Sequence, residues 1–250
     1  MKSVLFLAPL AQAGTVVWNG FFDASYTLDT LDTWSWSNQI EPYQWYIHGS
    51  GATSKYLELS EDFKNPADEA DAKGIRISID STSSWNGQTM MRSELIPQTS
   101  EDLGSGKLFY HFSLQTKEEN APDASLEHQI AFFESHFTEL KFGGSQSALN
   151  WMANSQSHWS APLTPGTWYN FAYEIDFSAQ TVGLWASNGS EPLTQAVAPV
   201  SASTQTNSQD WHIGELRLDN GQAGPAEDWF WSGIYVESGE ITKDVAGPSV

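Results

Sequence analysis

Apolar and polar residues alternate along most of the chain with a period of two, which places successive side chains on opposite faces of a β-strand. The segment 168–176 shows this clearly, because Tyr169, Phe171, Tyr173 and Ile175 fall on one face. The same alternation predicts further strands over 75–80, 108–114, 130–137, 181–186, 211–218 and 229–236. We expect the apolar faces of these strands to build the core.

Turn signals separate the predicted strands: Asn86-Gly87, Gly104-Ser105-Gly106, Gly143-Gly144, Pro165-Gly166, Asn188-Gly189 and Asn220-Gly221. Many strands with frequent turns, no long helical period and no internal repeat predict an all-β sandwich or jelly roll. Residues 65–72 are expected to form a short helix with an early proline. Residues 117–124 and 197–209 are predicted to be surface loops, and residues 242–250 a frayed tail.

Composition restricts the possible partners. The chain has 250 residues, which suits a single large all-β domain, and no cysteine, so neither a disulfide nor a thiolate site is possible. A formal net charge of -20 opposes binding to nucleic acid, to anionic membranes and, without a locally basic cleft, to anionic polysaccharides. A neutral polymer is compatible with this charge. We expect a monomer, although the sequence does not determine the oligomeric state.

The N-terminus has the pattern of a secretory signal peptide. Lys2 precedes a short apolar run, and Ala11-Gln12-Ala13 forms a small-x-small cleavage site before Gly14. We therefore expect residues 1–13 to be a signal peptide, residues 14–250 a single mature domain, and the protein to be secreted. No other segment has the roughly 20 apolar residues of a membrane span. The glycosylation sequon Asn188-Gly189-Ser190 agrees with export.

Two glutamates in strand-like apolar segments are the candidate catalytic groups. Glu94 follows Arg92 by two residues, and Glu134 precedes His136 by two, so each carboxylate has a basic neighbour on its own strand face. Period two also places His128, Ile130 and Phe132 on the Glu134 face. Two carboxyl groups in unlike environments can act as acid and base across a glycosidic bond. The apolar strand favours Glu134 as the acid.

Structural roles are the alternatives for these charged residues. Arg92 and Glu94 would also suit an ion pair that joins two strands, and the Glu134 segment an edge strand with a mixed face. His212 is either a satisfied structural histidine or a residue that tunes a carboxylate or binds a sugar hydroxyl.

The aromatic segment 34–48 is the candidate substrate-binding region. Trp34, Trp36 and Trp45 lie there among amide side chains, and a flat aromatic ring can carry the apolar face of a sugar. Core packing is the alternative for each of them. The scattered histidines give no metal-ligand pattern, so we expect no metal site and no cofactor, with calcium bound by Asp and backbone oxygens left open.

Several motifs in this order resemble glycoside hydrolase family 131, a group of fungal β-glucanases. They are Gly14-Thr15-Val16-Val17-Trp18-Asn19-Gly20-Phe21-Phe22, Lys73-Gly74-Ile75-Arg76, Trp85-Asn86-Gly87-Gln88-Thr89-Met90-Met91-Arg92-Ser93-Glu94-Leu95-Ile96-Pro97, the Glu134 segment, and Trp211-His212-Ile213-Gly214-Glu215-Leu216-Arg217-Leu218. The resemblance covers nearly the whole of residues 14–250.

This resemblance implies a β-jelly roll of two antiparallel sheets with an open cleft. It also implies hydrolysis of β-1,3-, β-1,6- and β-1,4-linked glucans with inversion. The two carboxylates proposed as catalytic in the family correspond to Glu94 and Glu134, and the Arg and His of its cleft to Arg92 and His212. Inversion requires the two carboxyl groups to be roughly 6.5–9.5 Å apart. The preferred linkage, and exo or endo action, depend on loops that the sequence does not describe.

Two other functions compete with hydrolysis. Arg92-Ser93-Glu94-Leu95 is also similar to the Arg-Ser-Glu-Leu core of jelly-roll alginate lyases, but Ile96 replaces the Arg that usually follows. Gln129-Ile130-Ala131 lacks the His of their Gln-Ile-His triplet, and the chain has few cations for a uronate. A lectin-like module that binds glucan without turnover is the other alternative.

Overall fold

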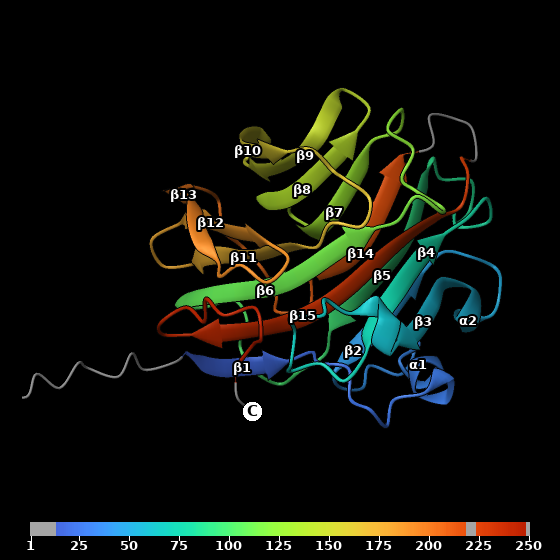
Figure 1. The fold of residues 1–250 in the computed structure, drawn as a ribbon, viewed down its shortest axis with the longest axis horizontal. Helices are drawn as coiled ribbons and strands as arrows, with labels where there is room; N and C mark the ends of the chain where they lie inside the picture. The colour runs from blue at the N-terminus through green and yellow to red at the C-terminus, as the bar shows by residue number, and fades with distance from the viewer. Residues whose placement is uncertain (1–13, 219–223, 249–250) are drawn as a thin grey trace, which may run out of the picture.

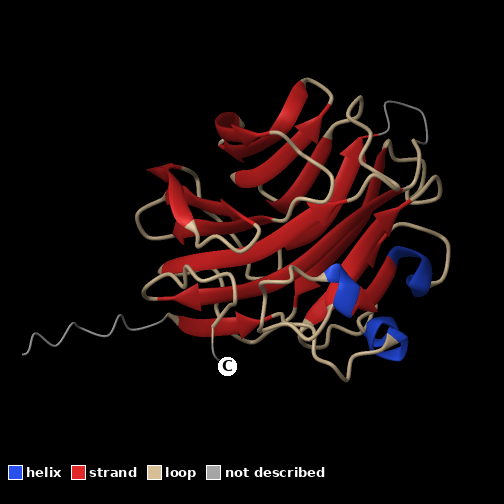
Figure 2. Ribbon diagram, viewed as in Figure 1, coloured by secondary structure: helices blue, strands red, loops and turns tan. Residues whose placement is uncertain are grey.

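The chain folds into two antiparallel β-sheets packed face to face as a jelly-roll sandwich, which confirms the predicted fold class (Figure 1). The computed structural model describes residues 14–218 and 224–248. Strands are the predominant secondary structure, and the few short helices gather at one end (Figure 2). The predicted signal peptide and the Asn220-Gly221 turn lie outside the described residues. No helix in the described part of the chain is long and apolar enough to cross a membrane.

The first sheet has eight strands in the order β13-β12-β11-β6-β15-β4-β3, and β1 pairs with β15 beside this path. Its strands are β1 (Thr15–Asn19), β3 (Leu57–Ser60), β4 (Gly74–Ile79), β6 (Lys107–Thr116), β11 (Tyr169–Asp176), β12 (Thr181–Asn188), β13 (Thr194–Ser201) and β15 (Glu227–Ser238). The helices are α1 (Leu28–Thr33), α2 (Thr53–Tyr56) and the 3-10 turn η1 (Glu61–Phe63).

The second sheet has seven strands in the order β10-β9-β8-β7-β14-β5-β2. They are β2 (Tyr43–Ile47), β5 (Met90–Pro97), β7 (His128–Phe133), β8 (Thr138–Gly143), β9 (Gln146–Ala153), β10 (Gln156–Ala161) and β14 (Trp211–Leu218). Each of the seven strands predicted from alternation corresponds to an observed strand. The central strands β7, β14 and β5 lie side by side, although they come from distant parts of the sequence (Figure 1).

The core lies between the two sheets and is rich in aromatic rings. The predicted apolar face of β11, from Tyr169 to Ile175, is buried there. From the other sheet Trp211 packs against Tyr110 with 5.0 Å between ring centroids. Burial of such large side chains contributes on the order of 1.5–3 kcal/mol each, which allows the sandwich to form without disulfides.

The helix predicted over residues 65–72 is wrong. Asn65 and Asp68 instead accept hydrogen bonds from the backbone N–H groups of Ala67, Ala70 and Asp71. Side chains that bond nearby backbone groups in this way offer an alternative to the helical pattern, and they hold the segment in turns.

Two predicted irregular segments are more ordered than expected. Strand β13 covers the start of the predicted loop 197–209, because an edge strand exposes its side chains and so tolerates polar residues. The predicted loop 117–124 is confirmed. The tail is attached up to residue 246: Lys243 accepts a backbone hydrogen bond from Leu193, and Ala246 accepts two from Glu69 and Ala70.

A β-bulge between β7 and β14 changes which residues face the solvent side of the second sheet. His212 pairs with Phe132 and Glu215 with Ile130, so Ile213 and Gly214 lie opposite the single Ala131, whose φ is +45°. The period-two face predicted for β7 is therefore wrong. Ile130 belongs to the core, whereas Phe132 packs on His212 at the outer face.

Candidate active site

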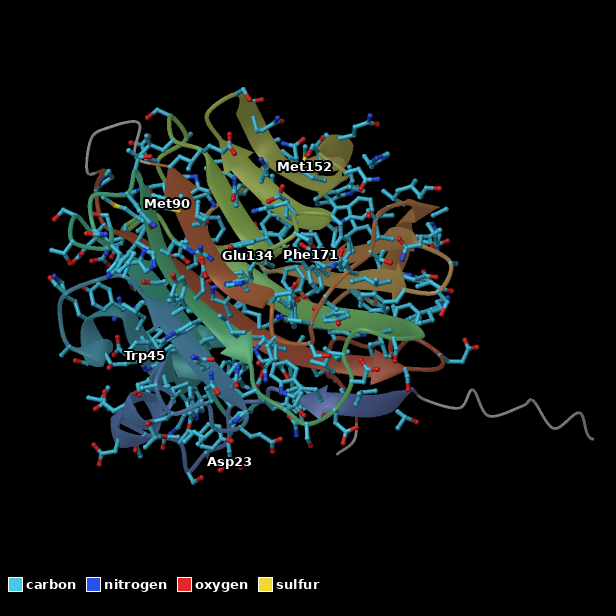
Figure 3. The ribbon with its side chains drawn as sticks, turned by 180° about the vertical axis from the view of Figure 1, so that it is seen from behind. Asp23, Trp45, Met90, Glu134, Met152 and Phe171 are labelled. Atoms are coloured by element: carbon cyan, nitrogen blue, oxygen red, sulfur yellow. The ribbon has the colours of Figure 1, made fainter. Side chains whose placement is uncertain are left out.

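A cluster of two carboxylates, an arginine and a histidine lies on the outer face of the seven-stranded sheet. Arg92 and Glu94 come from β5, and His212 comes from the neighbouring β14. Glu134 follows the last residue of β7 and lies in the turn to β8, where its backbone N–H donates to the carbonyl of Asp210. Figure 3 shows Glu134 near the middle of this face.

Arg92 and His212 both bridge the two carboxylates. Arg92 Nε donates to Glu94 Oε1 at 2.8 Å, and Nη2 donates to Glu94 Oε2 at 3.0 Å and to Glu134 Oε2 at 3.3 Å. His212 Nδ1 donates to Glu94 Oε2 at 2.6 Å, and Nε2 lies 3.1 Å from Glu134 Oε2. The site thus brings together four of the residues predicted from the sequence.

The two carboxylates differ sharply in exposure. The side chain of Glu94 is 0% exposed and that of Glu134 is 55% exposed. Both oxygens of Glu94 are occupied by Arg92 and His212, whereas Glu134 presents most of its carboxylate to solvent. Glu134 is therefore the carboxylate that a bound substrate can reach directly.

Gly214 allows β14 to approach β5 closely beside this cluster. It pairs with Glu94 in the sheet and has a φ of +143°. A Cβ at this position would lie 2.4 Å from the carbonyl oxygen of Ser93 and 2.8 Å from Cα of Glu94. A side chain there would push Glu94 away from His212 or distort the bulge.

Aromatic rings hold the basic groups from both sides. The Arg92 guanidinium lies 4.9 Å from the ring centroid of Tyr46 and 5.4 Å from that of Phe132. Phe132 also stacks between His212 at 4.8 Å and His136 at 5.3 Å, with interplanar angles of 4°. Tyr46 lies within the predicted substrate-binding segment 34–48, whereas the contact of Phe132 with the basic groups was not predicted. In the sheet Tyr46 of β2 pairs with Glu94 of β5, and this register places the Tyr46 ring beside the cluster.

The pKa values of the cluster follow from these contacts. The hydrogen bond from His212 lowers the pKa of Glu134 to about 2, with further lowering by the charges of His212 and Arg92 against the effect of burial. Burial opposes ionisation of Glu94, but the charges of His212 and Arg92 outweigh it and lower its pKa. Burial also opposes protonation of His212, yet the charge of Glu94 and the hydrogen bonds to both carboxylates raise its pKa to about 9.

At neutral pH the cluster therefore holds two carboxylate anions, one guanidinium and one imidazolium. Glu134 is ionised in this substrate-free state, because its basic neighbours matter more than the apolar strand on which the preference for Glu134 as the acid rested. That preference stays a prediction. The ionisable proton of the cluster is on His212. The Oε2 atoms of Glu94 and Glu134 lie 3.0 and 3.3 Å from the same Arg92 nitrogen, so they cannot be further apart than the sum of these distances.

The other predicted site residues have different positions. Trp34 is only 1% exposed and packs in the core 5.1 Å from Tyr43, so its predicted role as a sugar platform is wrong. His136 lies beside the cluster but binds Glu139 through Nδ1 at 2.9 Å. Trp36 and Trp45 line a pocket next to Arg92, discussed below.

A metal site is not indicated in the described part of the chain. No group of three or more His, Cys, Asp or Glu residues there could hold a metal ion. The cluster also balances its own charges with Arg92 and His212, so its carboxylates already have cationic partners.

Comparisons with known proteins identify the family of this chain. The chain matches the family described as Glycoside hydrolase 131 catalytic N-terminal domain over residues 16–242. It is similar to the crystal structure of a GH131 beta-glucanase catalytic domain from Podospora anserina, with 51% identity and a TM-score of 0.89, over 94% of this chain and 100% of that chain. The catalytic domain of the glycoside hydrolase family 131 protein from Coprinopsis cinerea matches with 53% identity and a TM-score of 0.87, over 92% and 98% of the respective chains. No curated protein matches. The chain belongs to glycoside hydrolase family 131.

Proposed function

We propose that this protein is a secreted β-glucanase that hydrolyses β-1,3-, β-1,6- and β-1,4-linked glucans with Glu94 and Glu134 as its essential carboxylates. The observation that supports the proposal most directly is the exposed, ionised Glu134 beside a protonated His212 in the outer-face cluster. Similarity to a GH131 beta-glucanase supplies the substrate class. The acidic net charge of -20 agrees with a neutral polymer.

In this proposal the two carboxylates have unequal tasks. Glu134 contacts the substrate, because more than half of its side chain is exposed. Glu94 is closed off, and its task is to hold Arg92 and to keep His212 protonated and oriented. His212 carries the titratable proton of the cluster at neutral pH, and its Nε2 lies 3.1 Å from Glu134 Oε2, where the substrate approaches.

Inversion sets a further condition. An inverting pair of carboxyl groups is roughly 6.5–9.5 Å apart so that a water fits between them. The shared Arg92 nitrogen holds the two Oε2 atoms near or below the short end of this range. Inversion by Glu94 and Glu134 also requires a water to reach Glu94, whose carboxylate is enclosed in the substrate-free protein. In this proposal Glu134 moves away from Arg92 when substrate binds, which its exposed position permits, and this movement opens the path to Glu94.

Lyase chemistry fits the cluster less well. A lyase must neutralise a uronate carboxylate with cleft cations, but Arg92 already binds both glutamates, and Lys141 is 2.9 Å from Glu127. The cations of this face are thus committed to carboxylates of the protein.

The test is to incubate the secreted protein with laminarin, a β-1,6-glucan and carboxymethyl cellulose, and to record reducing ends together with the ultraviolet absorbance of unsaturated sugars. We expect reducing ends without absorbance from wild type, and none from Glu134→Gln. An unsaturated product from a uronate polymer would instead indicate a lyase. Tight glucan binding without any product would indicate a lectin-like module. The first anomer to appear, followed by proton NMR, tests inversion.

A further inference from the structure

An uncharged aromatic pocket lies directly beside the catalytic cluster. Its lining consists of Trp36, Trp45, Tyr46, Ile47, His48 and Trp85, and its volume is about 390 Å³. This is within the range of about 300–1,000 Å³ that small-molecule sites occupy. Tyr46 joins the pocket to the cluster, because the same ring lies 4.9 Å from the Arg92 guanidinium.

The two walls of the pocket are large and exposed. Trp36 comes from the loop before β2 and is 53% exposed, and Trp85 comes from the loop before β5 and is 57% exposed. Exposed aromatic surface of this size is costly in water and marks a binding site more often than isolated apolar residues do. The two tryptophans are linked by a row of rings, with Trp36–Tyr46 at 4.8 Å, Tyr46–His48 at 4.6 Å and His48–Trp85 at 6.4 Å.

The floor of the pocket is held rigidly. Trp45 donates from Nε1 to the carbonyl oxygen of Leu31 at 2.9 Å, which fixes its ring. Tyr46 is held between Trp36, His48 and the Arg92 guanidinium. A preorganised floor lowers the entropy cost of binding, because fewer side chains have to be ordered.

His48 supplies polar groups that have no partner within the protein. Both of its ring nitrogens are buried and make no hydrogen bond. Burial, followed by the charge of Arg92, lowers the pKa of His48, so its ring is neutral at pH 7. A neutral imidazole offers one donor and one acceptor, and a sugar hydroxyl satisfies them once the half-buried ring turns a nitrogen toward the pocket.

We infer that this pocket is a binding subsite for a neutral sugar ring of the substrate chain, with Trp36 and Trp85 as walls and His48 as the contact to a hydroxyl. The inference rests on the proposed glucanase function and adds the residues that bind the chain on the β2 side of the cleavage point. Apolar faces of a β-linked glucosyl unit would lie on the tryptophans. The absence of a charged residue from the lining of this pocket favours a glucosyl over a uronosyl unit.

The two sides of the cluster are unlike, which gives the substrate a direction. Beyond Glu134, on the side of β8, the outer face carries the charged residues Glu139 and Lys141. On the side of β2 lies the pocket, whose lining is aromatic and uncharged. The pocket therefore dominates affinity for the chain, and the charged side contributes less.

Binding is tested without turnover by titrating cellotetraose and laminaritetraose into Glu134→Gln protein, using calorimetry and tryptophan fluorescence. Variants Trp36→Ala and Trp85→Ala are added to this background. We expect each substitution to raise Kd by about tenfold, which corresponds to the loss of one stacked ring. His48→Phe keeps an aromatic ring but removes the ring nitrogens, and it should raise Kd by about threefold or more.

Trp185→Phe is the matched control, because Trp185 lies on β12 of the other sheet and outside the pocket. It should leave Kd unchanged. If Trp36→Ala and Trp85→Ala bind both tetraoses as tightly as this control, or if the parent protein binds neither, the subsite is not where we place it. Glucan hydrolysis by wild type is measured separately. Its absence would overturn the proposed function, whereas unchanged binding with active wild type would overturn only the subsite.

Discussion

Exchanging each glutamate of the cluster for glutamine separates the carboxylate that contacts substrate from the one that supports the site. Glu94 and Glu134 share the same basic partners but differ in burial, with side-chain exposures of 0% and 55%. Glu94→Gln and Glu134→Gln are therefore a matched pair of substitutions with one chemical change and two environments.

The expected effects on stability follow from burial. Removing one partner from a buried ion pair costs about 3–5 kcal/mol, because the remaining charges stay buried. In Glu94→Gln the new amide N–H₂ also faces Arg92 and His212, which are donors themselves. An exposed pair contributes about 0–1 kcal/mol, so Glu134→Gln should scarcely change the free energy of unfolding.

The assay is urea unfolding at pH 7, followed by tryptophan fluorescence, together with hydrolysis of laminarin. We expect Glu134→Gln to keep the stability of wild type and to lose turnover. Glu94→Gln should lose turnover and also about 3–5 kcal/mol of the free energy of unfolding. Glu118→Gln, in an exposed loop, controls for the exchange itself and should change neither quantity.

The reasoning would be refuted if both substitutions lowered the free energy of unfolding equally, since burial would then not distinguish the two sites. Retained hydrolysis in Glu134→Gln would be equally damaging, because no other exposed carboxylate of the cluster could replace it.

Three further predictions test the cluster and its supports. The fold raises the pKa of His212 from 6.5 to about 9, so its contribution to stability is complete below pH 6.5 and is lost as the pH rises through 9. Urea unfolding across this range should show that the free energy of unfolding falls by up to about 3 kcal/mol, and a flat profile would contradict this. Gly214→Ala places a Cβ 2.4 Å from the backbone of β5, so we expect it to destabilise by about 1–3 kcal/mol and to abolish hydrolysis. Gly166→Ala shares the strain of a positive φ, +81°, but its Cβ meets nothing within 4 Å, so this control should keep hydrolysis. Burial and then the charge of Asp68 raise the pKa of Asp71 well above 3.8, so lowering the pH should stabilise wild type relative to Asp71→Asn. In urea unfolding, the free energy of unfolding of wild type minus that of the variant should be larger at pH 5 than at pH 7, by at most about 1.4 kcal/mol per pH unit. The same difference at both pH values would exclude the effect.

The sequence by itself determined the parts of this protein that depend on neighbours along the chain. Period-two alternation identified β11 and its buried face, because a strand's side chains alternate wherever it pairs. The spacing of Arg92 and Glu94 likewise placed both on one face of β5, and the structure joins them at 2.8 Å. The ordered set of motifs was sufficient to indicate the family.

Only the tertiary structure decided which tryptophans are exposed at the pocket and which pack in the core. Trp34, Trp36 and Trp45 lie in one segment and look alike in sequence, but the first is buried, the second is 53% exposed, and the third is fixed by Leu31. Exposure depends on what packs over each ring, and those groups come from distant segments. Trp85, across the pocket, carried no local signal of its role.

The active site itself is also a tertiary result. His212 meets Glu94 because β14 pairs with β5, and it meets Glu134 because β14 also pairs with β7, whose last residue directly precedes the glutamate. The bulge opposite Ala131 sets which residues of β7 face outward. An extra residue in one strand shifts the pattern of all that follow it, and alternation alone cannot show this. The pKa values of Glu134 and His212 then follow from which charges the fold brings within hydrogen-bonding distance, which depends on strand pairing and not on any single strand.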